Sequence, residues 1–501
     1  MSKNFLFTTF LLLLALSTKA QTVSSTVVDK KTKEPIPYAT VQYSEHGGLI
    51  TNEEGRFSIQ LEAAPTLTDS LHISSMGYEK TRVSIQGLDS VIPLSPKPIE
   101  LKGVFLFDKT LTVDEIMDKV KERFPGNYST DLSQNRLFFR QSNLNHLNKL
   151  DIEFKKSTIA ELDKELLDSI LRITPRDAAY YTETLADYNT GGGDSKLHII
   201  KAAELYDKNN EGSMEALSEK MEKIFRDNVK SDSFLKIKSG LFGTKVQVDS
   251  IIQASEEAKE VKDSLSDSND DHFFHSRKAN LNNLFSQLFF QEDSKINVIE
   301  KSNRYNFTLR DYTSIDDAGV YVIDFTPGWR ADFKGTLYVN MEDFAVMRIA
   351  YQNTKKLRNI HLFGFTYEET VYKGKTIYQK GSDGKYRPKY IEKELGNRAG
   401  VDRPLKVIEK NRHVKGKNKQ NELSLHLDII NISTDKSEVV IFDTEKIDES
   451  QYNSVKENST VKATYLSKYS PEFWKGYNIM EPNAAIRGFS VQEEDPVSSE
   501  Q

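Results

Sequence analysis

The nine histidines are the first residues to examine for chemistry, because histidine, cysteine and carboxylate side chains make the usual zinc sites. None of them begins a His-Glu-x-x-His motif, and the chain contains no cysteine. One pair stands out, His272-Phe-Phe-His275 after Asp270-Asp271. On a helix the two imidazoles would share a face and could bind a metal together with a carboxylate. The usual third-ligand pattern is missing, so we interpret them as exposed histidines at the end of a solvated linker and predict no metal site.

Nucleophile and phosphate motifs are also missing or incomplete. No Gly-x-Ser-x-Gly occurs, although a triad of scattered residues stays an alternative because triads are recognised by geometry. Gly374-Lys375-Thr376 matches the end of a phosphate-binding loop, but Glu369 stands where that loop needs its first glycine. We predict a hairpin turn at Lys373-Gly374 instead. We therefore predict no catalytic residue and no cofactor, and expect that the protein is not an enzyme.

Aromatic side chains surround the stretch TPGWRADF, residues 326–333. Trp329 next to Arg330 is typical of a loop that contacts a sugar or a lipid, while the alternative is a cluster that caps a sheet edge or core. The predicted ligand-contact residues are Phe325, Trp329, Arg330, Phe333 and Tyr338.

The first twenty residues form an export signal. Lys3 supplies the positive start, Phe5–Leu16 form an apolar run, and Thr18 and Ala20 are the small residues before the predicted cut. The run is too short to cross a bilayer as a stable helix, and no later stretch of about 20 apolar residues follows. We expect an exported mature chain with no transmembrane segment. Its location would be periplasmic, outer-membrane-associated or at the cell surface.

The composition removes several classes of protein. Without cysteine there are no disulfides, thiol nucleophiles or thiolate metal sites, so stability must come from core burial. A net charge of −6 gives no electrostatic case for binding nucleic acid. The expected partners are envelope proteins, including outer-membrane proteins, or a hydrophobic ligand, the latter because of the apolar alternation in the large predicted sheet.

The pattern of apolar residues predicts a mainly β protein with an α+β middle. An N-terminal β-sandwich of the seven-strand type precedes a helical and mixed region, and a large curled antiparallel sheet follows. The predicted divisions are a signal peptide (1–20), the sandwich (21–105), the mixed α/β region (106–253), an acidic linker with a short helix (254–294), a β meander (295–490) and a disordered tail (491–501).

Helices of the middle region are predicted from capping patterns and apolar periodicity. Thr112-Val-Asp-Glu115 opens a helix that Pro125-Gly126 ends, and Thr158-Ile-Ala-Glu161 opens a second helix. Ser213 caps a third, and a short amphipathic helix covers Asn280–Phe290.

The N-terminal motifs resemble those of a known module. Val27-Val28-Asp29, EPIPYATV, Thr51–Phe57 and LHISSMGYEKTRV follow one another in the order and spacing of the carboxypeptidase-like regulatory domain. That resemblance covers about residues 22–105 and implies a transthyretin-like sandwich without catalytic residues. The later stretches VYVIDFTP and GTLYVNMEDFAVMRI are similar to the curled sheet of periplasmic lipoprotein carriers, in an exported bacterial family of unknown function.

From these patterns we expect a non-enzymatic exported envelope protein with a binding or scaffold role. The large sheet would be its ligand or partner surface. Three alternatives stay open: a periplasmic carrier of lipid or lipidated protein, a hydrolase with a dispersed catalytic site, and a surface glycan-binding or adhesion module. Fold alone does not choose among them.

Overall fold

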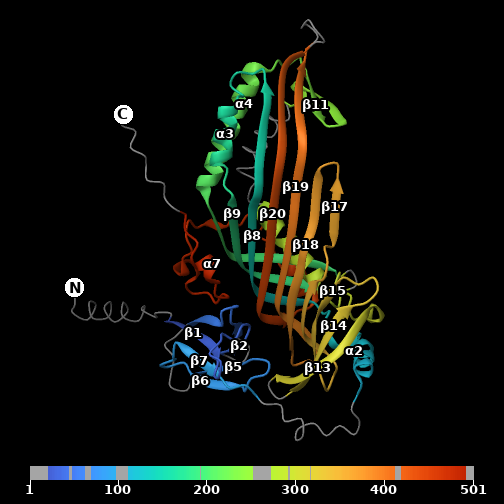
Figure 1. Cartoon of the computed structure of the whole chain (residues 1–501). Coiled ribbons are helices and arrows are strands. Elements are labelled where there is room, and N and C mark those ends of the chain that lie inside the picture. The colour runs from blue at the N-terminus through green and yellow to red at the C-terminus, as the bar shows by residue number, and fades with distance from the viewer. Residues whose placement is uncertain are drawn as a thin grey trace, which may run out of the picture.

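The computed structural model describes residues 21–43, 48–61, 69–97, 111–191, 193–251, 272–291, 294–315, 318–411 and 419–491. The predicted signal peptide, residues 254–271 of the predicted linker and the tail from residue 492 lie outside the described residues. A small N-terminal β-sandwich lies at the base of a tall sheet of very long strands (Figure 1).

The predicted β-sandwich is confirmed. One sheet has the order β4-β1-β7 and the other β3-β2-β5-β6. Alternate residues of their strands face each other and form the core, and Val27, Phe57 and Ile73 are at most 1% exposed. The strands are β1 (Gln21–Asp29), β2 (Thr40–Gln42), β3 (Gly48–Ile50), β4 (Arg56–Leu61), β5 (Ser70–Ser74), β6 (Thr81–Ser84) and β7 (Val91–Leu94).

The predicted antiparallel meander is also confirmed and supplies eight strands of a 14-stranded sheet. Its strands are hydrogen-bonded in the order β13-β14-β15-β16-β18-β19-β20, while β17 pairs with β18. The bounds are β13 (Tyr305–Ile315), β14 (Ala318–Pro327), β15 (Phe333–Asn340), β16 (Val346–Asn353), β17 (Arg358–Leu362), β18 (Phe365–Lys380), β19 (Tyr386–Lys410) and β20 (Lys419–Lys446).

Strands from the middle of the chain complete this sheet. After β20 the order continues β8-β9-β10-β21, all antiparallel except for the β10–β21 pair, and the hairpin of β11 and β12 joins β19. Residues 133–206 therefore share one sheet with the meander. The bounds are β8 (Ser133–Ser157), β9 (Asp177–Gly191), β10 (Asp194–Tyr206), β11 (Phe234–Ser239), β12 (Phe242–Gln247) and β21 (Thr464–Tyr465).

The helices differ from prediction mainly at their ends. The capping box of Thr112 and Glu115 is present in α2, but Pro125 does not end this helix, which runs on to Asn127. The predicted second capping box is wrong, because Asp163 is the N-cap of α3. Likewise Asp207, not Ser213, caps α4. The helices are α2 (Val113–Asn127), α3 (Lys164–Ile173), α4 (Lys208–Asn228), α6 (Glu449–Ser454), α7 (Ala484–Arg487), unlabelled helical segments over 248–251 and 272–286, and the 3₁₀ turns η1 (Ser302–Arg304) and η2 (Pro471–Trp474).

The predicted hairpin turn at Lys373-Gly374 is wrong. Both residues lie inside β18, and the turn before that strand is at Phe363-Gly364. A glycine is needed within the strand because a Cβ on Gly374 would lie 2.5 Å from Tyr351 Oη and 2.6 Å from Glu392 O. Close packing, rather than a turn, explains this glycine.

Among the described helices, none is both long and apolar enough to span a bilayer.

Candidate functional site

The two faces of the long strands can be followed through their register. Directly paired residues share a face, and β20 pairs with β19 without interruption from Glu422 to Val440. We call the face that carries Val439 the inner face and the one that carries Val440 the outer face. Val440 packs with the sandwich and the C-terminal segment, so the outer face is covered at its base.

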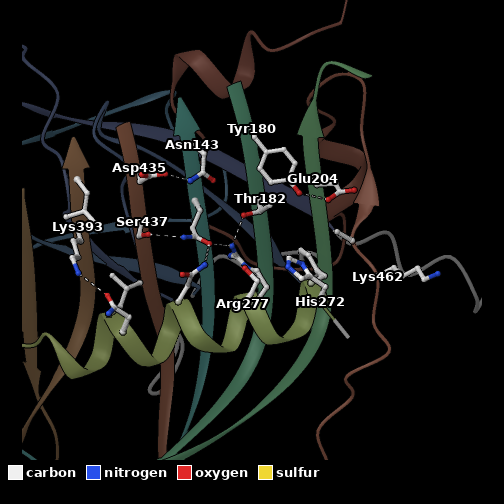
Figure 2. Close-up of a pocket in the computed structure, with 18 residues that line it drawn as sticks. Asn143, Tyr180, Thr182, Glu204, His272, Arg277, Lys393, Asp435, Ser437 and Lys462 are labelled. Atoms are coloured by element: carbon white, nitrogen blue, oxygen red, sulfur yellow. Dashed lines mark hydrogen bonds between the residues drawn. The ribbon is translucent and has the colours of Figure 1, made fainter. Parts of the chain in front are cut away.

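The 272–286 helix covers the base of the inner face (Figure 2). Its apolar residues recur every three or four positions, which places them on one side of a helix. Phe274, Leu281 and Leu284 are at most 4% exposed and pack with Phe139 and Val439 of the sheet. The sequence predicted only the second half of this helix.

A polar cavity of about 780 Å³ lies between this helix and the strands (Figure 2). It lies above the apolar residues through which the helix contacts the sheet. Its walls are mostly charged, amide and hydroxyl side chains from the helix, β8, β9, β10, β19, β20 and the segment just before β21. This volume lies in the range of small-molecule sites. Residues that line it include Gln141, Asn143, Thr182, Arg277, Lys393 and Asp435.

Arg277 is the most buried cation of the cavity, with 2% of its surface exposed. Its guanidinium donates to Thr182 Oγ1 at 2.6 Å, to Phe139 O at 2.9 Å and to the Gln141 side chain, and it stacks 3.8 Å over the Phe139 ring. All of these acceptors are neutral, and Arg277 Nε has no acceptor among the described residues. Burial lowers the pKa of Arg277 to about 9.

Lys393 is the second buried cation, 7% exposed, and it donates to Asn283 Oδ1 at 3.0 Å. Burial, with a smaller contribution from Lys295, lowers the pKa of Lys393 to about 8. The two carboxylates of the wall are held by neutral donors, because Tyr180 donates to Glu204 at 2.7 Å and Asn143 donates to Asp435. The cavity therefore contains two buried cations whose hydrogen-bond acceptors are all neutral.

Above the cavity the inner face becomes apolar. The apolar residues of three neighbouring strands stand next to one another in register, as in the row Val401, Ile429 and Leu150. Each residue of this apolar stripe is partly exposed, and none belongs to the buried clusters found in the described part of the chain. The apolar stripe consists of Leu147, Leu150, Ile152, Phe154, Val401, Leu405, Val407, Leu423, Leu425, Leu427 and Ile429.

The apolar stripe lies beside a groove close to the cavity, and on β8 the outer face behind it is charged. A groove of about 440 Å³ borders the stripe at Val401 and Ile429, with Phe365 and Tyr367 on its other side. Leu395, which lines the cavity, and Ala399, which lines the groove, share one face of β19 and lie about 13 Å apart along the strand. On β8 the outer face behind the stripe is instead charged, with His146, Lys149, Asp151, Glu153 and Lys156.

The five predicted ligand-contact residues do not lie together on this surface. Phe325 and Phe333 belong to the core beneath β13–β16, with 0% and 5% of their surface exposed. Trp329 is 76% exposed, and the Arg330 guanidinium stacks 3.9 Å over its ring. Tyr338 is partly exposed, 5.3 Å beneath the Arg348 guanidinium. Ligand contact at Trp329 and Arg330 stays a prediction.

The histidine pair lies on the 272–286 helix, where both His272 and His275 are exposed. His272 lines the polar cavity. Within the described residues, no group of three histidine, aspartate or glutamate side chains is arranged to hold a metal ion.

Sequence reasoning missed Arg277 and Lys393. A signal for Arg277 was present, because it falls three residues after Phe274 and four before Leu281, on the apolar side of its helix. A charged residue at such a position indicates a buried polar site. For Lys393 the strand pattern gave no comparable signal, since lysine and glutamate alternate around it.

Comparisons with known proteins match the N-terminal sandwich and the rest of the chain differently. The family model of the CarboxypepD_reg-like domain matches residues 23–105. No curated protein matches the chain. Two solved structures are similar to its later part, a domain assigned to outer membrane lipoprotein sorting from Vibrio parahaemolyticus and a LolA superfamily protein from Nitrosomonas europaea.

The structural likeness is distant. The Vibrio domain is 9% identical, with a TM-score of 0.20, over 68% of this chain and 97% of that domain. The Nitrosomonas protein is 11% identical, with a TM-score of 0.17, over 69% of this chain and 99% of that protein. At these TM-scores the likeness carries no argument about function. The comparisons identify the N-terminal sandwich, and no more of the chain, as a CarboxypepD_reg-like domain.

Proposed function

We propose that this chain is an exported, non-catalytic binding protein that holds a hydrophobic ligand on the inner face of its large sheet. The observation that carries the proposal is the apolar stripe. Eleven apolar side chains of three neighbouring strands lie on one face there, interrupted on β19 by Arg403, and each is partly exposed. An exposed apolar surface of this extent on a protein marks a place where something binds.

The contrast between the two faces supports this assignment. On β8 the outer face at the same height is charged, so this strand is amphipathic across the thickness of the sheet. At the base of the same inner face, apolar residues such as Phe139 and Val439 are fully covered by the 272–286 helix. A ligand on the apolar stripe would give the upper strands the same kind of apolar contact.

A binding assay with a matched pair of substitutions tests the proposal. Ile429 lies on the inner face and Ile430, its neighbour in β20, lies on the outer face. We expect Ile429→Gln to weaken binding of the fluorescent apolar probe N-phenyl-1-naphthylamine several-fold, and Ile430→Gln to leave it unchanged. Equal binding by both variants and the parent would show that the probe does not use the inner face.

A second function is favoured by the tips of two hairpins, which adjoin the groove at Phe365. Leu241, Phe242, Leu362, Phe363 and Phe365 are between 49% and 97% exposed, and the rings of Phe242 and Phe363 lie 4.9 Å apart. Exposed aromatic clusters of this kind suit docking onto a partner. We propose that these tips contact an envelope protein. Replacing Phe242 and Phe363 with Ser would then abolish its co-purification without changing probe binding.

A further inference from the structure

The polar cavity has an electrostatic feature that its described residues do not explain. Two cations, Arg277 and Lys393, are at least nine-tenths buried there. In the described part of the chain, neither has a carboxylate within ion-pair distance, and every acceptor that they contact is neutral. A buried charge without a partner costs free energy, so natural proteins pair such groups or give them a function.

A second buried arginine in the same strands shows how such a buried charge is usually paired. Arg140 precedes Gln141 on β8 and faces the outer side, where it is 1% exposed. Its guanidinium meets Glu183 of β9 at 2.6 and 2.8 Å. This pairing raises the pKa of Arg140, whereas the pKa of Arg277 is lowered. On the inner side the equivalent positions are Gln141 and Thr182, which supply no negative charge.

The composition of the cavity wall agrees with the binding of an anion. Arg277, Lys393 and Lys462 face Glu204 and Asp435, so three cations meet two carboxylates. Glu204 already accepts a hydrogen bond from Tyr180, and Asp435 accepts one from Asn143. The amides of Asn280 and Asn283 also line the cavity and can donate further hydrogen bonds.

We propose that the polar cavity binds the anionic head group of an amphiphile whose chain lies on the apolar stripe. This inference rests on the proposed function, and it adds the ligand class. The cavity and the groove follow one another along the same face of β19, so one molecule can span both. Phosphate and carboxylate head groups share the chemistry that an arginine recognises with paired hydrogen bonds.

Titration calorimetry at pH 7 with three probes separates the contribution of the alkyl chain to binding from that of the charge. Decyl phosphate carries both a chain and a charge, decanol has the chain alone, and inorganic phosphate has the charge alone. We expect decyl phosphate to bind at least about tenfold more tightly than decanol, and inorganic phosphate to bind far more weakly than either. Lys393→Gln and Arg277→Gln should each reduce the preference for decyl phosphate, while Lys80→Gln, on the exposed sandwich surface, should not.

Each other outcome has a separate meaning. If decyl phosphate and decanol bind equally to the parent protein, the anion site is wrong and the hydrophobic site stands. If neither binds, the proposed function itself fails. If inorganic phosphate binds as tightly as decyl phosphate, the amphiphile is wrong. Should Arg277→Gln fail to fold, the Lys393→Gln variant alone decides, because an unchanged preference in it overturns the inference.

Discussion

Glu183 is the residue on which the base of the outer face depends. Its carboxylate accepts from Arg140 Nε at 2.8 Å and from Trp474 Nε1 at 2.8 Å, and it is fully buried. Arg140 also donates to the Met480 carbonyl at 2.8 Å. One carboxylate thus joins β8 and β9 to the C-terminal segment.

Replacing this carboxylate should be costly. We expect Glu183→Ala to lower the free energy of unfolding by about 3–5 kcal/mol, because it leaves Arg140 buried and unpaired. Asp187→Ala is the matched control, since it breaks the more exposed ion pair with Arg136 in the same strands and should cost less than about 1 kcal/mol. Urea denaturation measures both. Similar losses in the two variants would contradict the assigned role.

Lys393 should make stability depend on pH. Its pKa is lowered from 10.5 to about 8, so between these values the unfolded state binds more protons than the folded state. The free energy of unfolding must then rise with pH across that window. We expect Lys393→Met, which cannot be protonated, to be more stable than the parent at pH 7 by on the order of 1–3 kcal/mol.

The difference between the two proteins is the quantity to measure, because tyrosines also titrate above pH 10. The advantage of Lys393→Met should shrink as the pH rises from 8 to 10.5. A difference that stays constant over this range would show that Lys393 keeps its ordinary pKa in the folded protein.

Single residues with chemistry were only partly predictable from sequence. The exposed positions of His272 and His275 follow from their acidic surroundings. Arg277 and Gln141, in contrast, come from segments more than a hundred residues apart, and their meeting depends on the 272–286 helix crossing β8. Local pattern alone carries no information about such a crossing.

At the scale of elements, strands were predicted where alternation is regular, and turns were mispredicted where glycine serves packing. Ser382-Asp383-Gly384 is a turn, and Asp383 accepts a hydrogen bond from Arg387 across it. Gly374 has turn-like neighbours in sequence yet lies within β18, because the Tyr351 side chain passes over it. Sequence reasoning had no means of seeing a side chain that arrives from β16.

Adding a single methyl group at Gly374 tests the role of this glycine. Gly374→Ala would place Cβ 2.5 Å from Tyr351 Oη, closer than real contacts allow, so we expect a loss of about 1–3 kcal/mol. Adding Tyr351→Phe, which removes the hydroxyl, should restore part of that loss in a double-mutant cycle. Thermal unfolding followed by circular dichroism measures the set, and strictly additive effects would contradict the proposed clash.

At the scale of the whole molecule, the sandwich and the large sheet share one buried cluster. It contains Val27 and Phe57 of the sandwich together with Phe138, Tyr390 and Trp474. Glu392 of β19 accepts hydrogen bonds from Tyr38 and from Tyr390, both at 2.9 Å. Continuous packing of this kind couples the unfolding of the two parts.

We expect calorimetry of the parent protein to show one unfolding transition. Glu392→Ala should lower its midpoint, because it removes the acceptor of the Tyr38 hydroxyl and one of the two carboxylates that Tyr390 contacts. The matched control is Glu394→Ala. Glu394 lies on the same strand as Glu392, and its partly exposed carboxylate pairs with Lys373 of β18. Two separate transitions in the parent, with one unaffected by Glu392→Ala, would show that the sandwich folds independently.

The architecture was predictable where neighbours in sequence are neighbours in space. The sandwich motifs and the meander hairpins are local, and both were expected. The pairing of β20 with β8 joins residues nearly three hundred positions apart, so the meander was expected to stand alone. This pairing adds the third long strand to the inner face, and without it the apolar stripe would lack Leu150, Ile152 and Phe154.

The most direct test of the account is native mass spectrometry of the protein purified from its own cells, followed by denaturing extraction. The account predicts an adduct that extraction releases as an amphiphile with an acyl chain and an anionic head group. It further predicts that the adduct is lost in Ile429→Gln and kept in Ile430→Gln. A clean unliganded mass for the parent protein, or an adduct that survives in both variants, would contradict the claim that the inner face is a ligand-binding surface.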